Sequence, residues 1–194
     1  MDLIRHIKEQ QPHIITLQET HISTPFNQER FGNYFGATQA FWTHSCGIIS
    51  TCSDICITQL HILEDDRHLF TRVEHLQQAF TPFYLLTIYA PSASPTLRHR
   101  FFTKLYHSPI FDPPLTYSQR MIITGDFNYS YQRPDLHRNA PPEWFAMLTN
   151  NFFQCINNES ETTPLPTFRR GNSTSTIDYI FASAPTFQNT ITTQ

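Results

Sequence analysis

The chain has 194 residues, of which 39% are hydrophobic and 14% aromatic, so it carries enough apolar material for one packed domain of ordinary size. Its formal net charge is -3 and its pI is near 6.3, so the field of the whole molecule does not attract a polyanion. No apolar run approaches the roughly 20 residues of a membrane span. We therefore expect a single globular domain over residues 1–194, with no membrane partner.

The first half of the sequence predicts one short helix followed by strands. An apolar stripe through Leu3, Ile4 and Ile7 predicts a helix over residues 2–10, which stops before Pro12. Short apolar runs then predict strands over residues 13–20, over two segments of 46–63 that are separated by a turn near Ser53 and Asp54, and over 68–76 and 83–91.

The second half predicts two helices and two strong strands. One helix is predicted over about residues 96–106, and another over 141–152 with Pro142 at its start. The run at residues 121–124 predicts a buried strand that breaks at Gly125, and residues 175–183 predict a last strand. Repeated strands with a few helices and no internal repeat predict a layered α/β sandwich.

Polar side chains stand at the ends of three predicted strands. Glu19 in IITLQETH, Asp126 in ITGDFN and Asp178 in STIDYIF each follow an apolar run, where an unpaired charge is costly unless it is exposed or bound to a cation. Taken together with Asn128 and with Tyr89 in TIYAPS, they offer the hard oxygen ligands that suit Mg²⁺. A phosphodiester is then a natural substrate.

Each of these residues also has a simpler interpretation. Glu19 can be an ordinary strand end, and Tyr89 can be a core aromatic residue with a wet hydroxyl. Asp126 and Asn128 can form an Asx turn after Gly125, or they can share one face if the strand continues. Asp178 is the hardest to explain in this way, because it lies within an apolar strand.

A local basic surface would be needed for a nucleic-acid partner. Arg98, His99 and Arg100, or Arg169 and Arg170, can supply a little of it. For both groups the favoured interpretation is solvated charges beside loops.

The segments HIITLQETH, TIYAPS, ITGDFN and STIDYIF, in this order, resemble the serial signatures of the endonuclease/exonuclease/phosphatase superfamily. The segment PTFRRGNSTSTIDYIFAS resembles in particular the endonuclease domains of LINE-type (non-LTR) retrotransposons. The resemblance runs from about Ile14 to Ser183. It implies an α/β (α+β) fold, a four-layered sandwich, with Mg²⁺-dependent hydrolysis of phosphodiesters, Mn²⁺ as an alternative ion, and DNA as the partner.

The resemblance also implies a role for each residue at the strand ends. Glu19 would be the principal Mg²⁺ ligand, and Asp126 would position and activate the attacking water. Asn128 would hold a phosphate oxygen and order Asp126, and Tyr89 would contact the scissile phosphate. Asp178 would orient a catalytic histidine, as a buried acid fixes an imidazole in other enzymes.

The sequence departs from the superfamily pattern at both ends. No Asn precedes Asn27, although relatives begin with a strand that carries one, and the final Ser-Asp-His segment is absent. None of the ten histidines follows His137, so Asp178 has no visible partner downstream. We therefore expect an incomplete domain that lacks the first and last strands of the family and has impaired activity.

Two hypotheses from different classes follow. The first is an Mg²⁺-dependent DNA endonuclease of a retrotransposon-like protein, and the second is a catalytically inactive remnant with at most weak nucleic-acid or protein binding. A phosphatase or lipid phosphodiesterase of the same superfamily is a third possibility. The four cysteines lack the spacing of a zinc site, which favours a reduced, intracellular protein, and the retrotransposon resemblance implies a nuclear location.

Overall fold

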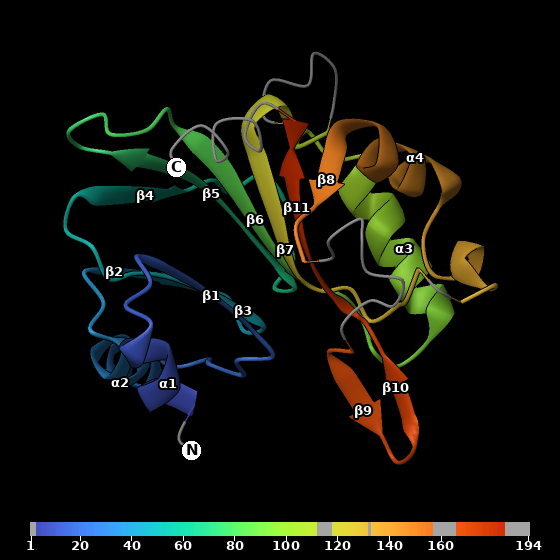
Figure 1. Cartoon of the computed structure of the whole chain (residues 1–194), viewed down its shortest axis with the longest axis horizontal. Helices are drawn as coiled ribbons and strands as arrows, with labels where there is room; N and C mark the ends of the chain where they lie inside the picture. The colour runs from blue at the N-terminus through green and yellow to red at the C-terminus, as the bar shows by residue number, and fades with distance from the viewer. Residues whose placement is uncertain (1–2, 112–117, 132, 157–165, 185–194) are drawn as a thin grey trace. The chain divides into compact units, whose positions relative to one another are not determined.

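Residues 3–111, 118–131, 133–156 and 166–184 are described by the structure, which is a computed structural model (Figure 1). Its contacts divide the chain into two compact units, Met1–Thr87 and Ile88–Gln194, called here the first and the second unit. Each unit is described by itself. The expectation of a single domain over residues 1–194 stays a prediction.

The first unit combines two helices with antiparallel strands. Its elements are α1 Leu3–Glu9, β1 Ile14–Gln18, α2 Pro25–Phe35, β2 Gln39–Trp42, β3 Cys46–Ser50, β4 Ile55–Gln59, β5 His68–His75 and β6 Phe83–Tyr89, which ends in the second unit. One sheet has the order β1-β3-β2, and β4 pairs with β5, which lies next to β6.

The core of the first unit lies under its two helices. Ile15, Phe35 and Ile49 form a buried cluster, and apolar side chains of α1 and α2 pack against it. On the other side, β3 packs against β4 and β5, and the Gln39 side chain accepts a hydrogen bond from the Ile57 amide at 2.9 Å. Burial of this apolar surface is the main stabilising contribution here.

Helix α2 was not predicted, although the sequence carries both of its end signals. The Thr24 hydroxyl caps the helix by accepting a hydrogen bond from the backbone amide of Asn27 at 3.3 Å, and Pro25 occupies the first turn. Gly36 ends the helix in the left-handed conformation, with φ 69°. The pattern of cap, proline and terminal glycine could have located this helix.

The second unit contains a sheet with helices packed beside it. Its elements are α3 Pro95–Tyr106, β7 Met121–Asp126, α4 Pro142–Asn151, β8 Phe152–Gln154, β9 Phe168–Arg170, β10 Ser173–Ser175, β11 Asp178–Ser183 and the short 3₁₀ helices η1 Ser118–Arg120 and η2 Leu136–Arg138. Strand β11 pairs antiparallel with both β7 and β8, and the end of β6 lies next to β7. Helices α3 and α4 pack against each other, while β9 and β10 form a separate hairpin (Figure 1).

Aromatic rings fill the core of the second unit. The ring of Phe102 on α3 lies 4.9 Å from that of Trp144 on α4 and 5.8 Å from that of Phe127, measured between centroids. The Trp144 indole donates a hydrogen bond to the Tyr129 hydroxyl at 3.1 Å. Because Phe127 and Tyr129 follow β7 directly, these contacts fix the segment that leaves that strand.

Strand β7 corrects one expectation. The predicted break at Gly125 is wrong, because the strand continues to Asp126. Gly125 has φ 145°, and a Cβ atom there would lie 1.9 Å from the Ile88 carbonyl oxygen. The glycine is therefore needed for close approach of two backbones, not for ending the strand.

The remaining predicted elements are confirmed, with shifts of a few residues at their ends. The second strand predicted within residues 46–63 is the largest exception, since β4 ends at Gln59. No helix in the described ranges is long and apolar enough to cross a membrane.

Candidate active site

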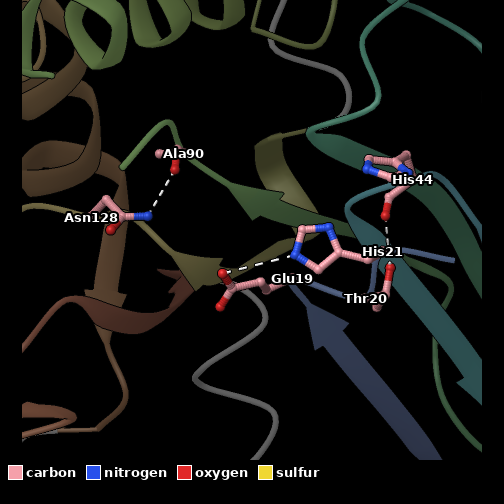
Figure 2. A network of polar contacts seen from close by, with 6 residues as sticks. All are labelled: Glu19, Thr20, His21, His44, Ala90 and Asn128. Carbon is pink, nitrogen blue, oxygen red and sulfur yellow. Dashed lines mark hydrogen bonds and ion pairs between the residues drawn. The ribbon is translucent and has the colours of Figure 1, made fainter. Parts of the chain in front are cut away.

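The segment that leaves β7 is an Asx turn. The Asp126 carboxylate accepts a hydrogen bond from the backbone amide of Asn128 at 2.8 Å. The interpretation of this pair as an Asx turn is therefore confirmed. Asn128 has φ 53°, so the expectation that both side chains share a face of one extended strand is wrong. The Asn128 side-chain amide donates to the Ala90 carbonyl at 2.8 Å (Figure 2), and the Ala90 amide donates to the Asp126 carbonyl at 2.8 Å. These bonds hold the carboxylate and the amide in fixed positions.

Asp178 lies directly opposite Asp126. In the antiparallel pairing of β11 with β7, these two residues are register partners, so their side chains project from the same face of the sheet. Like charges directly opposite each other are unfavourable, and a nearby cation or a bound proton relieves the repulsion. The strand register therefore brings two acidic residues of the predicted site together.

Burial raises the pKa of Asp178, and a hydrogen bond with the Thr167 side chain partly offsets this effect. The Thr167 hydroxyl oxygen also accepts hydrogen bonds from the amides of Ile177 at 3.0 Å and Asp178 at 3.1 Å. Thr167 thus fixes the start of β11, where Asp178 enters the sheet.

Tyr89 ends β6, directly before Ala90, and its side chain is buried with 8% of its surface exposed. Ala90, the next residue, is hydrogen-bonded to Asp126 and Asn128, so the backbone of Tyr89 lies close to these two residues. The burial of the Tyr89 side chain agrees with the simpler interpretation of a core aromatic residue. A contact between Tyr89 and a phosphate stays a prediction.

Glu19 belongs to the first unit, where it follows the last residue of β1. Glu19 and His21 both have left-handed backbones, with φ 54° and 51°, which is unusual for residues other than glycine. Between them, the Thr20 hydroxyl donates to the His44 carbonyl at 3.1 Å. The Glu19 carboxylate lies 4.0 Å from the His21 imidazole and is 64% exposed (Figure 2). A largely exposed carboxylate is therefore presented on a strained turn.

Arg98 is not a solvated charge, so that interpretation is wrong. Its guanidinium, on α3, donates hydrogen bonds to the Asn139 side chain at 2.9 Å and to the carbonyls of Pro91 at 3.0 Å and Ser92 at 3.1 Å. Burial lowers its pKa, while the nearby carboxylates of Asp126 and Asp135 act in the opposite direction. Arg98 thus ties the segment after β6 to η2 and adds positive charge near Asp126.

Arg98 and Asn128 border a pocket of about 550 Å³ in the second unit. Its lining includes Arg98, Asn128, Arg133, Asp135, Asn139 and Arg170. We call it the arginine pocket. Three guanidinium groups beside Asn128 are a suitable environment for an anionic group such as a phosphate.

The Glu19 carboxylate of the first unit suits a hydrated hard cation. It is open to water, and carboxylate oxygens are ligands that Mg²⁺ prefers. Within the described ranges, no three His, Cys, Asp or Glu side chains form a group that could hold a metal ion.

The sequence identifies the class of protein to which this site and fold belong. The chain belongs to the Endonuclease/Exonuclease/phosphatase family, whose profile matches residues 1–191. Members of this family generally depend on a divalent metal ion. A search of curated proteins finds no significant sequence match.

Solved structures show the same fold. The endonuclease domain of TRAS1, a telomere-specific non-LTR retrotransposon, has a TM-score of 0.66 and 14% identity, covering 95% of this chain and 78% of its own. The mannosyl-6-phosphatase of Bacteroides thetaiotaomicron VPI-5482 has a TM-score of 0.56 and 12% identity, with coverages of 94% and 75%. Truncated Caenorhabditis elegans TDP2 has a TM-score of 0.56 and 14% identity, with coverages of 92% and 73%. The mixed α/β fold of this family of hydrolases is thus confirmed.

Three polar residues near the site were not among the predicted site residues: His21, Thr167 and Arg98. His21 follows Glu19 within LQETH, and Thr167 lies within PTFRR, so both were within segments already recognised. Arg98 precedes the fully buried Phe102 by four residues, which places both on one face of α3. That spacing was the available signal that Arg98 faces inward.

Proposed function

We propose that this chain is an Mg²⁺-dependent phosphodiesterase whose substrate is DNA. The observation that carries the proposal is the register of β7 and β11, which sets Asp126 opposite Asp178. The Asx turn then adds Asn128, which borders the arginine pocket. A reactive carboxylate beside a cationic pocket is the arrangement that phosphodiester hydrolysis requires.

In this proposal the carboxylate of Asp126 orients the attacking water and takes its proton. The Asp126 carboxylate acts electrostatically on Arg98, so a positive charge lies near the proposed general base. Asn128 holds a phosphate oxygen, and Tyr89 contacts the scissile phosphate. Mg²⁺, or Mn²⁺ in its place, would be held by Glu19 and would neutralise charge on the phosphoryl oxygens.

The choice of DNA is supported by the arginine pocket and by the fold shared with a retrotransposon endonuclease domain. A retrotransposon-like origin would also imply a nuclear location. The mannosyl-6-phosphatase shares the fold as well, so a small phosphate ester is the alternative substrate class.

A supercoiled-plasmid nicking assay with Mg²⁺ tests the proposal. We expect nicking by the chain, loss of nicking in Asp126→Ala, and full nicking in the control Asp66→Ala, which changes an exposed aspartate in the first unit. Cleavage of an inositol or lipid phosphate without DNA nicking would refute DNA as the substrate. Equal nicking by Asp126→Ala would refute the proposed role of the site.

A second candidate is a catalytically inactive remnant. It is favoured by a specific observation: the Asp178 carboxylate, to which the resemblance assigns the orientation of a histidine, is hydrogen-bonded to the Thr167 side chain. In the same assay, a version extended by a Ser-Asp-His segment separates the two candidates. Nicking only after extension would indicate a site that is intact except for the histidine, and no nicking in any form would support the remnant.

A further inference from the structure

A second basic hollow lies on the second unit, apart from the residues assigned to the reaction. It has a volume of about 680 Å³ and is lined by Thr96, His99, Arg100, Thr103, Lys104 and Arg138. None of these lining residues is acidic, and the side chains of Arg100, Lys104 and Arg138 are exposed. We call it the α3 basic surface.

The α3 basic surface and the arginine pocket use the same two elements. Helix α3 contributes Arg98 to the arginine pocket and Arg100 to the α3 basic surface. The segment around η2 packs against α3. It contributes Asn139 to the arginine pocket and Arg138 to the α3 basic surface. Each lining holds three Lys or Arg residues, so the two hold six of the thirteen in the chain. Positive charge is thus concentrated here although the net charge is -3.

This concentration of positive charge suits a polyanion. Arg100 and Lys104 are four residues apart on α3, so their side chains lie on one face of the helix. Lysine, arginine and threonine side chains are typical of contacts with the phosphate groups of a nucleic-acid backbone. Such contacts position a strand without reading its sequence.

We propose that the α3 basic surface binds the sugar-phosphate backbone of a DNA substrate at a position away from the cleaved bond. This inference rests on the proposed function, because the strand would continue from the arginine pocket around α3. Binding there is electrostatic, so it depends steeply on salt and little on base sequence.

The test is the affinity for a short labelled DNA duplex, measured by fluorescence anisotropy at several salt concentrations without divalent metal. We compare the chain with Arg100→Gln/Lys104→Gln and with the control Arg5→Gln/Lys8→Gln, which makes the same charge change on α1. We expect the slope of log affinity against log salt to become less negative by about 2 in the first variant and to stay unchanged in the control.

An unchanged slope in Arg100→Gln/Lys104→Gln would overturn the inference, and so would absence of DNA binding by the chain at low salt. Displacement of the DNA by polyglutamate as readily as by unlabelled DNA would also overturn it, in favour of an acidic protein partner. Because binding is measured without metal, it is separate from hydrolysis. A reduced slope without nicking in any assay would leave the inference standing while the proposed activity fails, and nicking with an unchanged slope would do the reverse.

Discussion

At the scale of single residues, Asp178 shows how the fold sets the state of a carboxyl group. Its burial raises its pKa, and Asp126 stands opposite it across the strand pair. A raised pKa means that the folded chain binds this proton more tightly than the unfolded chain does. Ionisation of Asp178 therefore weakens the fold, and this loss grows as the pH rises above the ordinary value of 3.8.

Replacing Asp178 by Asn should therefore stabilise the protein at neutral pH. The amide cannot ionise, and its carbonyl oxygen can still accept the hydrogen bond from Thr167. Urea unfolding should give a higher midpoint for Asp178→Asn than for the parent at about pH 7, with the difference disappearing at about pH 3. The exposed Asp66→Asn serves as control, and a lower midpoint for Asp178→Asn at neutral pH would contradict the argument.

Gly125 is the second residue whose replacement has a defined physical cost. An alanine there would place its Cβ 1.9 Å from the Ile88 carbonyl oxygen, so two backbones would have to separate. We expect Gly125→Ala to lower the free energy of unfolding by about 3 kcal/mol or more. Urea denaturation, followed by tryptophan fluorescence, measures this change in the free energy of unfolding.

The matched control is Gly171→Ala. Gly171 also has a left-handed backbone, with φ 60°, but a Cβ there would meet no atom within 4 Å. Its replacement should cost only about 1 kcal/mol, the price of the backbone conformation alone. Equal losses in the two variants would show that the contact with Ile88 is unimportant.

At the scale of elements, Arg98 links three segments of the second unit. Its guanidinium bonds join α3 to the carbonyls that follow β6 and to the buried side chain of Asn139. Replacing it by Met would leave the buried Asn139 side chain without its donor and would remove two further hydrogen bonds to backbone carbonyls. We expect Arg98→Met to lower the free energy of unfolding by about 2 kcal/mol.

Two further variants serve as comparisons for Arg98→Met. Arg100→Met changes an exposed neighbour on the same helix and should alter the free energy of unfolding by less than about 0.5 kcal/mol. Arg98→Lys keeps the charge but not the planar fork, so it should fall between the parent and Arg98→Met. A midpoint for Arg98→Met equal to that of Arg100→Met would show that the three hydrogen bonds contribute little.

Most elements could be predicted because their signals are local. The apolar runs of β3, β5, β6 and β7, and the apolar stripe of α3, depend only on residues within each segment. The β9-β10 hairpin was missed, although Arg170 and Ser173 are paired across the two residues Gly171 and Asn172, a typical turn sequence. The break predicted at Gly125 was wrong because the reason for that glycine is a distant contact with Ile88.

The site was predictable only in part, for the same reason. The strand-end positions of Asp126 and Asp178 follow from the sequence, but their register depends on how β7 pairs with β11. The bonds of Arg98 reach Asn139, 41 residues away, and no local pattern encodes that contact. The catalytic roles assigned to Glu19 and its counterparts come from the resemblance and stay predictions.

At the scale of the whole molecule, net charge and local charge give opposite indications. A chain with a net charge of -3 is not expected to attract DNA, yet six of its thirteen Lys and Arg residues line two hollows of the second unit. Family membership and the shared fold define a hydrolase framework, while DNA as its substrate stays a proposal that the two hollows support.

The close approach at Gly125 also has a genetic consequence. Every missense change in a glycine codon adds a side chain, and at this position any side chain begins with a Cβ that meets the Ile88 carbonyl. Position 125 is therefore one at which we expect no amino-acid replacement to be neutral. Because Asp126 is the next residue, a single nucleotide change there would disturb the strand and the proposed reaction centre together.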